Sequence, residues 1–155
     1  MPGTAPSPRS LSHRRLAAAA LAGLVLVSGC GSSPSRKSAE DAAVERAVRR
    51  GVDDIRLTQD RRRLAARLSR VIATLRSERG SNATAERARS IALEGFEATR
   101  KGVGSQIAFI ENDRGEVAAA ARDARRADRY LRRGADEIRR AGTALGLHIG
   151  DLDGY

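Results

Sequence analysis

Apolar residues recur at helical spacing along the chain from residue 38 onward. Over residues 38–79 two series of valine, isoleucine and leucine, four residues each, recur at spacings of three and four, which puts the members of each series on one face of a helix. They are Val44, Val48, Val52, Ile55, Leu64, Leu68, Val71 and Leu75. Ser38 followed by Asp41 is close to a capping box and marks the start of this helix. Gly51 is its weak point, so the pattern allows either one long helix or a break there, with Asp53 capping a second helix.

A second helical pattern begins after the segment Arg79-Gly80-Ser81-Asn82, which combines a basic last residue, a glycine and polar turn formers. Its apolar line runs over residues 88–110 at spacings of three and four. Glycines at 95, 102 and 104 indicate either a kink or a close approach of two helices, and we expect a kink near residues 102–104.

A third pattern follows the turn at residues 112–115 and has the clearest stripe of small and apolar residues. The stripe consists of Val117, Ala121, Ala124, Leu131, Ala135, Ile138, Ala141 and Leu145. Residues 146–155 contain three glycines and are expected to form a loose tail. Together the patterns predict an all-α domain over residues 38–145, an antiparallel bundle of about three long helices. Small core residues predict a thin core, which a second copy or a partner would complete.

The first 29 residues have a different pattern. Arg9, Arg14 and Arg15 occur without any acidic residue, and residues 16–27 read LAAAALAGLVLV. Twelve residues of helix span about 18 Å, too short for a hydrocarbon core of about 30 Å. A basic start followed by an apolar stretch of this length is typical of a secretory signal peptide. The pair Arg14-Arg15 leaves the export route, Sec or Tat, open.

The apolar stretch ends in Leu26-Val27-Ser28-Gly29-Cys30, and Cys30 is the only cysteine of the chain. This segment resembles the lipobox of bacterial lipoproteins, in which an apolar residue and two small residues precede a cysteine. The resemblance covers residues 1–30. It implies cleavage between Gly29 and Cys30, a diacylglycerol on the Cys30 sulfur, and attachment to the extracytoplasmic face of the cell membrane, because two or more acyl chains anchor stably. The alternative is a chance cysteine after an ordinary signal peptide or a core helix.

Residues 30–37 then comprise the anchor and a linker rich in Ser, Gly and Pro, which composition predicts to be flexible. Arg36 and Lys37 would lie close to anionic headgroups, or simply keep the linker soluble.

Composition limits the chemistry that this chain can perform. Of 155 residues, 29 are Lys or Arg and 19 are Asp or Glu, a net charge of +10 that becomes +7 without residues 1–29. One cysteine excludes an internal disulfide, and Cys30, His13 and His148 are too few for a Cys/His zinc site. With Cys30 assigned to lipid and His148 in the tail, no nucleophile has a base and an orienting group. We therefore expect a protein without enzymatic activity, cofactor or metal.

The excess positive charge is concentrated in residues 61–79, which carry seven arginines and one glutamate. Six of them form a candidate surface for an anionic partner: Arg61, Arg62, Arg63, Arg67, Arg70 and Arg76. The competing interpretation is a solvated helix face paired with acidic residues of neighbouring helices. Nucleic acid is disfavoured as a partner by export and by the scarcity of aromatic residues.

The sequence thus predicts a lipid-anchored, non-catalytic binding or structural module of the cell envelope. Two alternatives remain open: a basic module that binds anionic lipid or wall polymer, and an accessory subunit of an envelope complex. An envelope protein or a second copy of the chain are further possible partners.

Overall fold

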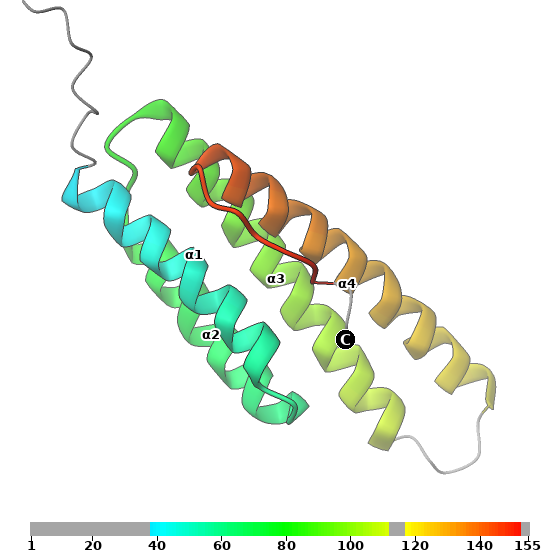
Figure 1. Ribbon diagram of the computed structural model, residues 1–155. Helices are drawn as coiled ribbons and strands as arrows, with labels where there is room; N and C mark the ends of the chain where they lie inside the picture. Colours follow the sequence, from blue (N-terminus) through cyan, green and yellow to red (C-terminus); the bar gives the residue numbers. More distant parts are fainter. Residues whose placement is uncertain (1–37, 112–116, 153–155) are drawn as a thin grey trace, which may run out of the picture. The chain divides into compact units, whose positions relative to one another are not determined.

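A computed structural model describes residues 38–111 and 117–152, which form four helices (Figure 1). They are α1 (Ala39–Leu57), α2 (Arg61–Ser77), α3 (Ala83–Glu111) and α4 (Val117–Ala144). The expected all-α class is confirmed for these residues, which contain no strand. The expected signal peptide, anchor and linker, and the turn at 112–115, lie outside the described residues.

The fourth helix arises because the first apolar pattern is divided at residues 58–60 and not at Gly51. Asp60 accepts a hydrogen bond from the backbone N–H of Arg63 at 2.8 Å and so caps the start of α2. Ser38 caps α1 in the expected way, since its hydroxyl oxygen accepts from the N–H of Asp41 at 3.1 Å. Gly51 lies inside α1 and is buried. A cap thus sets this boundary, whereas the low helix propensity of glycine does not.

Consecutive helices pack as neighbours, and α3 with α4 makes the most extensive pairing. Arg62 pairs with Glu111 and Arg76 with Glu97, so α2 and α3 run in opposite directions. All eight apolar residues of the first predicted pattern are buried in a core that also contains Phe96 and Ile138. The amphipathic spacing therefore places the core face of α1 and α2 correctly.

Glycines bring α3 and α4 together. A Cβ on Gly102 would lie 2.7 Å from Leu131 Cγ, and one on Gly134 would lie 2.2 Å from Thr99 Oγ1. Helix α3 runs without interruption through residues 102–104 (Figure 1). The glycines at 95 and 102 consequently serve close approach of two helices, the alternative to the expected kink.

The last predicted stripe is buried only in the second half of α4. Ala135, Ile138 and Ala141 lie in the core, whereas Val117 is 84% exposed. The first turns of α4 therefore present apolar side chains that the described part of the chain does not cover.

Residues 145–152 fold back along the helices, which differs from the expected loose tail. Gly146 has a φ of 70°, and the N–H of Leu147 donates to the carbonyl of Gly142 at 2.8 Å, which reverses the chain after α4. Leu147 and Leu152 are buried. Figure 1 shows this segment running back between α1 and α4. Its spaced apolar residues pack on the helices, which the glycines of the tail did not indicate.

Candidate interaction surfaces

The six candidate arginines of α2 are divided between two sides of the helix. Three of them face α3. Arg61 donates from Nε to Gln106 Oε1 at 2.9 Å, Arg62 pairs with Glu111, and Arg76 Nη2 lies 2.6 Å from Glu97 Oε1. Glu111 also raises the pKa of Arg62 by accepting its hydrogen bond. These three side chains thus belong to contacts between helices.

The other three arginines lie on the side of α2 that borders α1. Arg67 Nη1 is 2.9 Å from Asp54 Oδ1. Arg63 and Arg70 are exposed and have no carboxylate partner among residues 38–111 and 117–152. The candidate surface is therefore not one continuous free patch. Each of the two interpretations of the sequence accounts for part of it.

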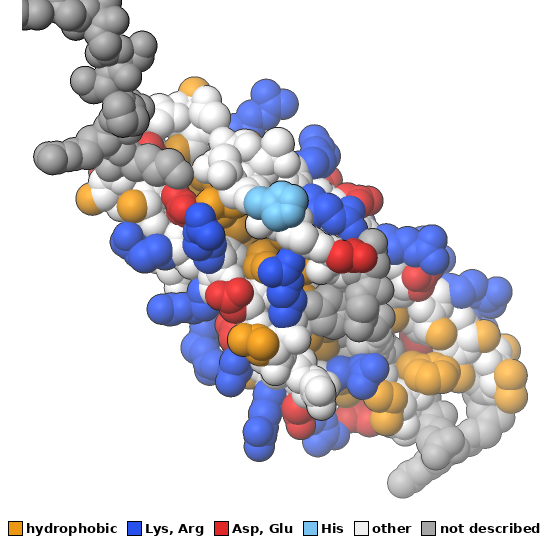
Figure 2. All heavy atoms as spheres, viewed as in Figure 1, with side chains coloured by type: hydrophobic (Ala, Val, Ile, Leu, Met, Phe, Trp, Pro, Cys, Tyr) orange, Lys and Arg blue, Asp and Glu red, His pale blue; other side chains and the backbone are white. Residues whose placement is uncertain are grey.

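The Arg67–Asp54 pair joins two rows of residues. Asp54 continues the row of Arg46 and Arg50 at intervals of four on α1, and Arg67 lies between Arg63 and Arg70 on α2. Residues three or four apart share a helix face. We call this surface the basic seam; it consists of Arg46, Arg50, Arg63, Arg67 and Arg70 around Asp54. Figure 2 shows Lys and Arg side chains gathered along the edge formed by α1 and α2.

Four guanidinium groups of the basic seam are unpaired within the described part of the chain. All five arginines are exposed, and only Arg67 has an ion-pair partner there. Asp53 and Asp60 are acidic residues at its borders. A row of free positive charges beside a single neutralised pair attracts polyanions.

Sequence reasoning missed Arg46 and Arg50. The α1 segment contains five acidic residues and four arginines, so its net charge is close to zero and does not mark it as basic. The available signal was the i, i+4 spacing of two arginines on the face opposite the valines. Local charge counts along the chain cannot show that the arginines of two helices form one surface once the helices pack together.

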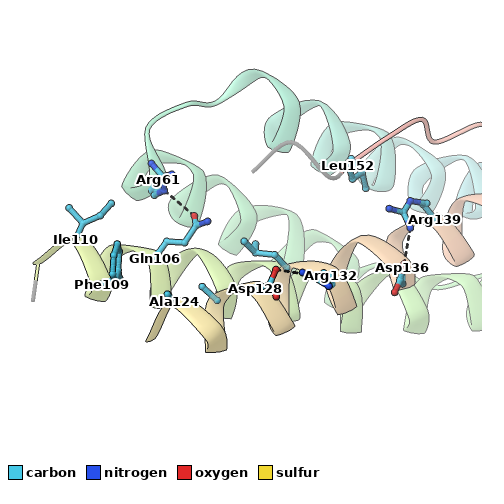
Figure 3. A pocket seen from close by; sticks show the side chains of 12 residues that line it. Arg61, Gln106, Phe109, Ile110, Ala124, Asp128, Arg132, Asp136, Arg139 and Leu152 are labelled. Atoms are coloured by element: carbon cyan, nitrogen blue, oxygen red, sulfur yellow. Dashed lines mark hydrogen bonds and ion pairs between the residues drawn. The ribbon is translucent and has the colours of Figure 1, made fainter. Parts of the chain in front are cut away.

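A groove lies between the start of α2, the end of α3, α4 and Leu152 (Figure 3). Its volume is about 780 Å³, and Phe109, Ile110 and Leu131 supply apolar lining. Phe109 and Ile110 remain 45% and 55% exposed. The charged groups in it are largely paired with one another. Arg132 binds Asp128 at 2.9 Å and Arg139 binds Asp136 at 2.7 Å, so neither guanidinium is left without a carboxylate.

The connection between α2 and α3 is held by two carboxylates. Asp41, in the first turn of α1, accepts from the N–H and hydroxyl of Ser81 at 2.9 and 2.7 Å, and these bonds lower its pKa. Glu86 accepts from Arg89 and from the N–H of Gly80, which lowers its pKa from 4.5 to about 2. Arg89 in turn donates to the carbonyl of Leu75 at 2.8 Å. This network ties α1, α2 and α3 together at the end where α1 begins.

Residues 38–111 and 117–152 hold neither a metal-binding cluster nor a membrane-spanning helix. In that part of the chain, no three His, Cys, Asp or Glu side chains are grouped to hold a metal. None of its helices combines the length and apolar character needed to cross a membrane. Cys30 and Gly29, the predicted lipidation and cleavage positions, lie outside it.

Comparison with models of protein families finds no match, and comparisons with curated proteins and with solved structures find no significant match.

Proposed function

We propose that the chain is an exported bacterial lipoprotein, held at the cell membrane through Cys30, whose helical unit is a non-catalytic binding or structural module of the envelope. The observation that carries this proposal is the order of segments in the first 30 residues. A basic start, a short apolar stretch and Val27-Ser28-Gly29 lead directly to the only cysteine. Each element has a physical role in export and lipid attachment.

The helical unit supports the proposal by beginning just after the predicted linker. The described residues, 38–111 and 117–152, belong to one compact unit. Its first helix has its own cap at Ser38 and does not depend on upstream residues for its first turn. Removal of residues 1–29 would therefore leave this unit intact. An anchored module of this kind acts by presenting a surface, and the basic seam is a surface with four arginines that have no ion pair within the described residues.

The proposal is tested by expressing the full chain in a bacterium with an alkyne-bearing fatty acid. The parent chain is expected to incorporate the label and to sediment with membranes. Cys30→Ala is expected to abolish the labelling and to release the helical unit into the soluble fraction. Ser28→Ala is the matched control, because it keeps a small residue before the cysteine and should leave labelling unchanged.

Two results would contradict the proposal. Labelling that persists in Cys30→Ala would show that lipid is attached elsewhere. Cleavage and secretion of the parent chain without label would show an ordinary signal peptide followed by an incidental cysteine.

A further inference from the structure

We propose that the basic seam binds the anionic headgroup surface of a phospholipid bilayer, so that the α1–α2 face rests on the membrane. The inference deepens the proposed function and rests on it for the choice of partner, because anchoring at Cys30 is what would bring this face to a bilayer.

The shape of the basic seam suits an extended surface. Arg46 and Arg50 lie on one helix and Arg63 and Arg70 on the neighbouring one. The ion pair between Arg67 Nη1 and Asp54 Oδ1, at 2.9 Å, holds the two helices side by side at this point. At 1.5 Å per residue the arginines extend over about 18 Å along the two helices. An extended, roughly flat surface that carries many negative charges can contact both rows at once. A small anion can contact only a part of them.

The charge of the basic seam is available to a partner. Arg67 is neutralised by Asp54, but Arg46, Arg50, Arg63 and Arg70 have no ion pair within the described residues. The arginines on the opposite side of α2 contrast with these, since Arg62 and Arg76 are used by Glu111 and Glu97 of α3. Arg61 also faces α3, where it bonds the neutral Gln106 and so keeps its charge. The free charges of Arg63 and Arg70 lie on the other side of α2, which borders α1.

The position of the basic seam favours a membrane over a free polymer. The predicted linker, residues 31–37, spans at most about 25 Å when fully extended. Cys30 would thus hold the start of α1 within about that distance of the bilayer. Arg36 and Lys37 add charge of the same sign in the linker itself. A lipid chain combined with a basic patch is a known two-part device for membrane binding, in which each part strengthens the other.

The test measures vesicle binding of a chain that begins at Gly31 and so lacks lipid but keeps the whole compact unit. Binding is measured by sedimentation with vesicles of phosphatidylcholine alone and of equal parts phosphatidylcholine and phosphatidylglycerol. We expect binding to the anionic vesicles only, and a loss of that binding at high salt, because screening weakens exposed charges.

The deciding comparison uses two variants with the same net charge. The seam variant carries Arg→Gln at positions 46, 50, 63 and 70. The control variant carries Arg→Gln at four exposed arginines that also lack an ion pair in the described part of the chain: Arg100, Arg122, Arg125 and Arg129. We expect about tenfold or greater weakening for the seam variant, following the contribution of each basic residue near a charged surface. The control should stay within about twofold of the parent chain.

Each alternative outcome overturns the inference. Equal weakening of both variants would show a response to net charge and not to the basic seam. Absence of binding by the parent chain, or seam-dependent binding of soluble polyphosphate without any binding to vesicles, would exclude the membrane as the partner. Far-UV circular dichroism verifies folding, and the pairs Arg46/Arg50 and Arg63/Arg70 are changed separately if the quadruple variant unfolds. Fatty-acid labelling at Cys30 is independent of every one of these results, so failure here leaves the proposed anchoring standing.

Discussion

Gly51 of α1 faces the ring of Phe96 of α3 so closely that an added Cβ would lie 2.3 Å from the ring carbon Cζ. Phe96 is fully buried and is the largest side chain among the completely enclosed core residues. The same added carbon would also lie 3.0 Å from Val71 Cγ1 of α2. Gly51 therefore provides the space in which one aromatic ring joins three helices.

Replacing Gly51 with alanine should destabilise the protein although alanine is the better helix former. Propensity alone would favour Gly51→Ala by about 1 kcal/mol. The methyl group would displace Phe96 in a packed core, and overpacking of this kind typically costs about 1–3 kcal/mol. We expect a net loss of stability in urea denaturation. Gly104→Ala is the control, since nothing lies within 4 Å of its added Cβ, and it should gain about 0.5–1 kcal/mol.

The coupling between Gly51 and Phe96 can be tested further by replacing the ring with a smaller side chain. Phe96→Leu alone should destabilise the protein, and Gly51→Ala should cost less in that background than in the parent chain. If the two changes are additive, the ring and the glycine are not coupled in the way the distance indicates.

Gly134 should tolerate a side chain even less than Gly51, for a different reason. Its added Cβ would lie 2.2 Å from Thr99 Oγ1 and 2.9 Å from the carbonyl oxygen of Gly95. The Thr99 hydroxyl donates to that carbonyl at 2.9 Å, so the methyl group would disrupt a buried hydrogen bond as well as the α3–α4 contact. We expect Gly134→Ala to lose more stability than Gly51→Ala, because backbone on the facing helix cannot move aside as a ring can. Thermal unfolding of the two variants under one set of conditions compares them directly, and equal losses would contradict this ranking.

Gly51 also marks the limit of what the sequence alone predicts about the fold. The spacing of Val44, Val48, Leu64 and Leu68 identified the buried face of α1 and α2, because amphipathic periodicity is a local property. The role of Gly51 depends on Phe96, which is 45 positions away, and no local pattern contains it.

The same limit applies to the candidate surface. Clustering of arginines in α2 was visible along the chain. Their division into paired and free groups was not, because Glu97, Glu111 and Asp54 approach only after folding. Arg46 and Arg50 joined the surface through the α1–α2 contact, which periodicity does not specify. The sequence therefore predicted the kind of surface and only part of its composition.

Acid should weaken the protein through Asp41 and Glu86. The pKa of each is lower in the folded chain than its ordinary value, and that of Glu86 falls from 4.5 to about 2. A lowered folded-state pKa contributes stability above the unfolded value, and this contribution disappears as pH falls through the folded value. We expect the melting temperature to decrease between about pH 5 and pH 2. Asp41→Asn should flatten this decrease while lowering stability at neutral pH.

The control for this prediction is Glu40→Gln, which removes the same charge from the same turn of α1. The Glu40 side chain is exposed and accepts no hydrogen bond from the described residues, whereas Asp41 binds Ser81 and Asn82. The melting temperature of the control should follow that of the parent chain at every pH. If Glu40→Gln flattens the pH dependence as much as Asp41→Asn, general charge near the start of α1 is responsible and not the link to Ser81.

Removing the side chain of Leu152 should destabilise the whole helical unit. Leu152 is 4% exposed and lies at the end of a segment whose Ile149 fills the space over Gly142, where an added Cβ would be 2.3 Å from Ile149 Cδ1. Truncating a buried leucine to alanine typically costs about 2–5 kcal/mol. His148→Ala, in the same segment but exposed, should change stability by less than about 0.5 kcal/mol. Urea denaturation of both variants distinguishes a packed segment from the loose tail that composition suggests, because in a loose tail the leucine and the histidine would matter equally little.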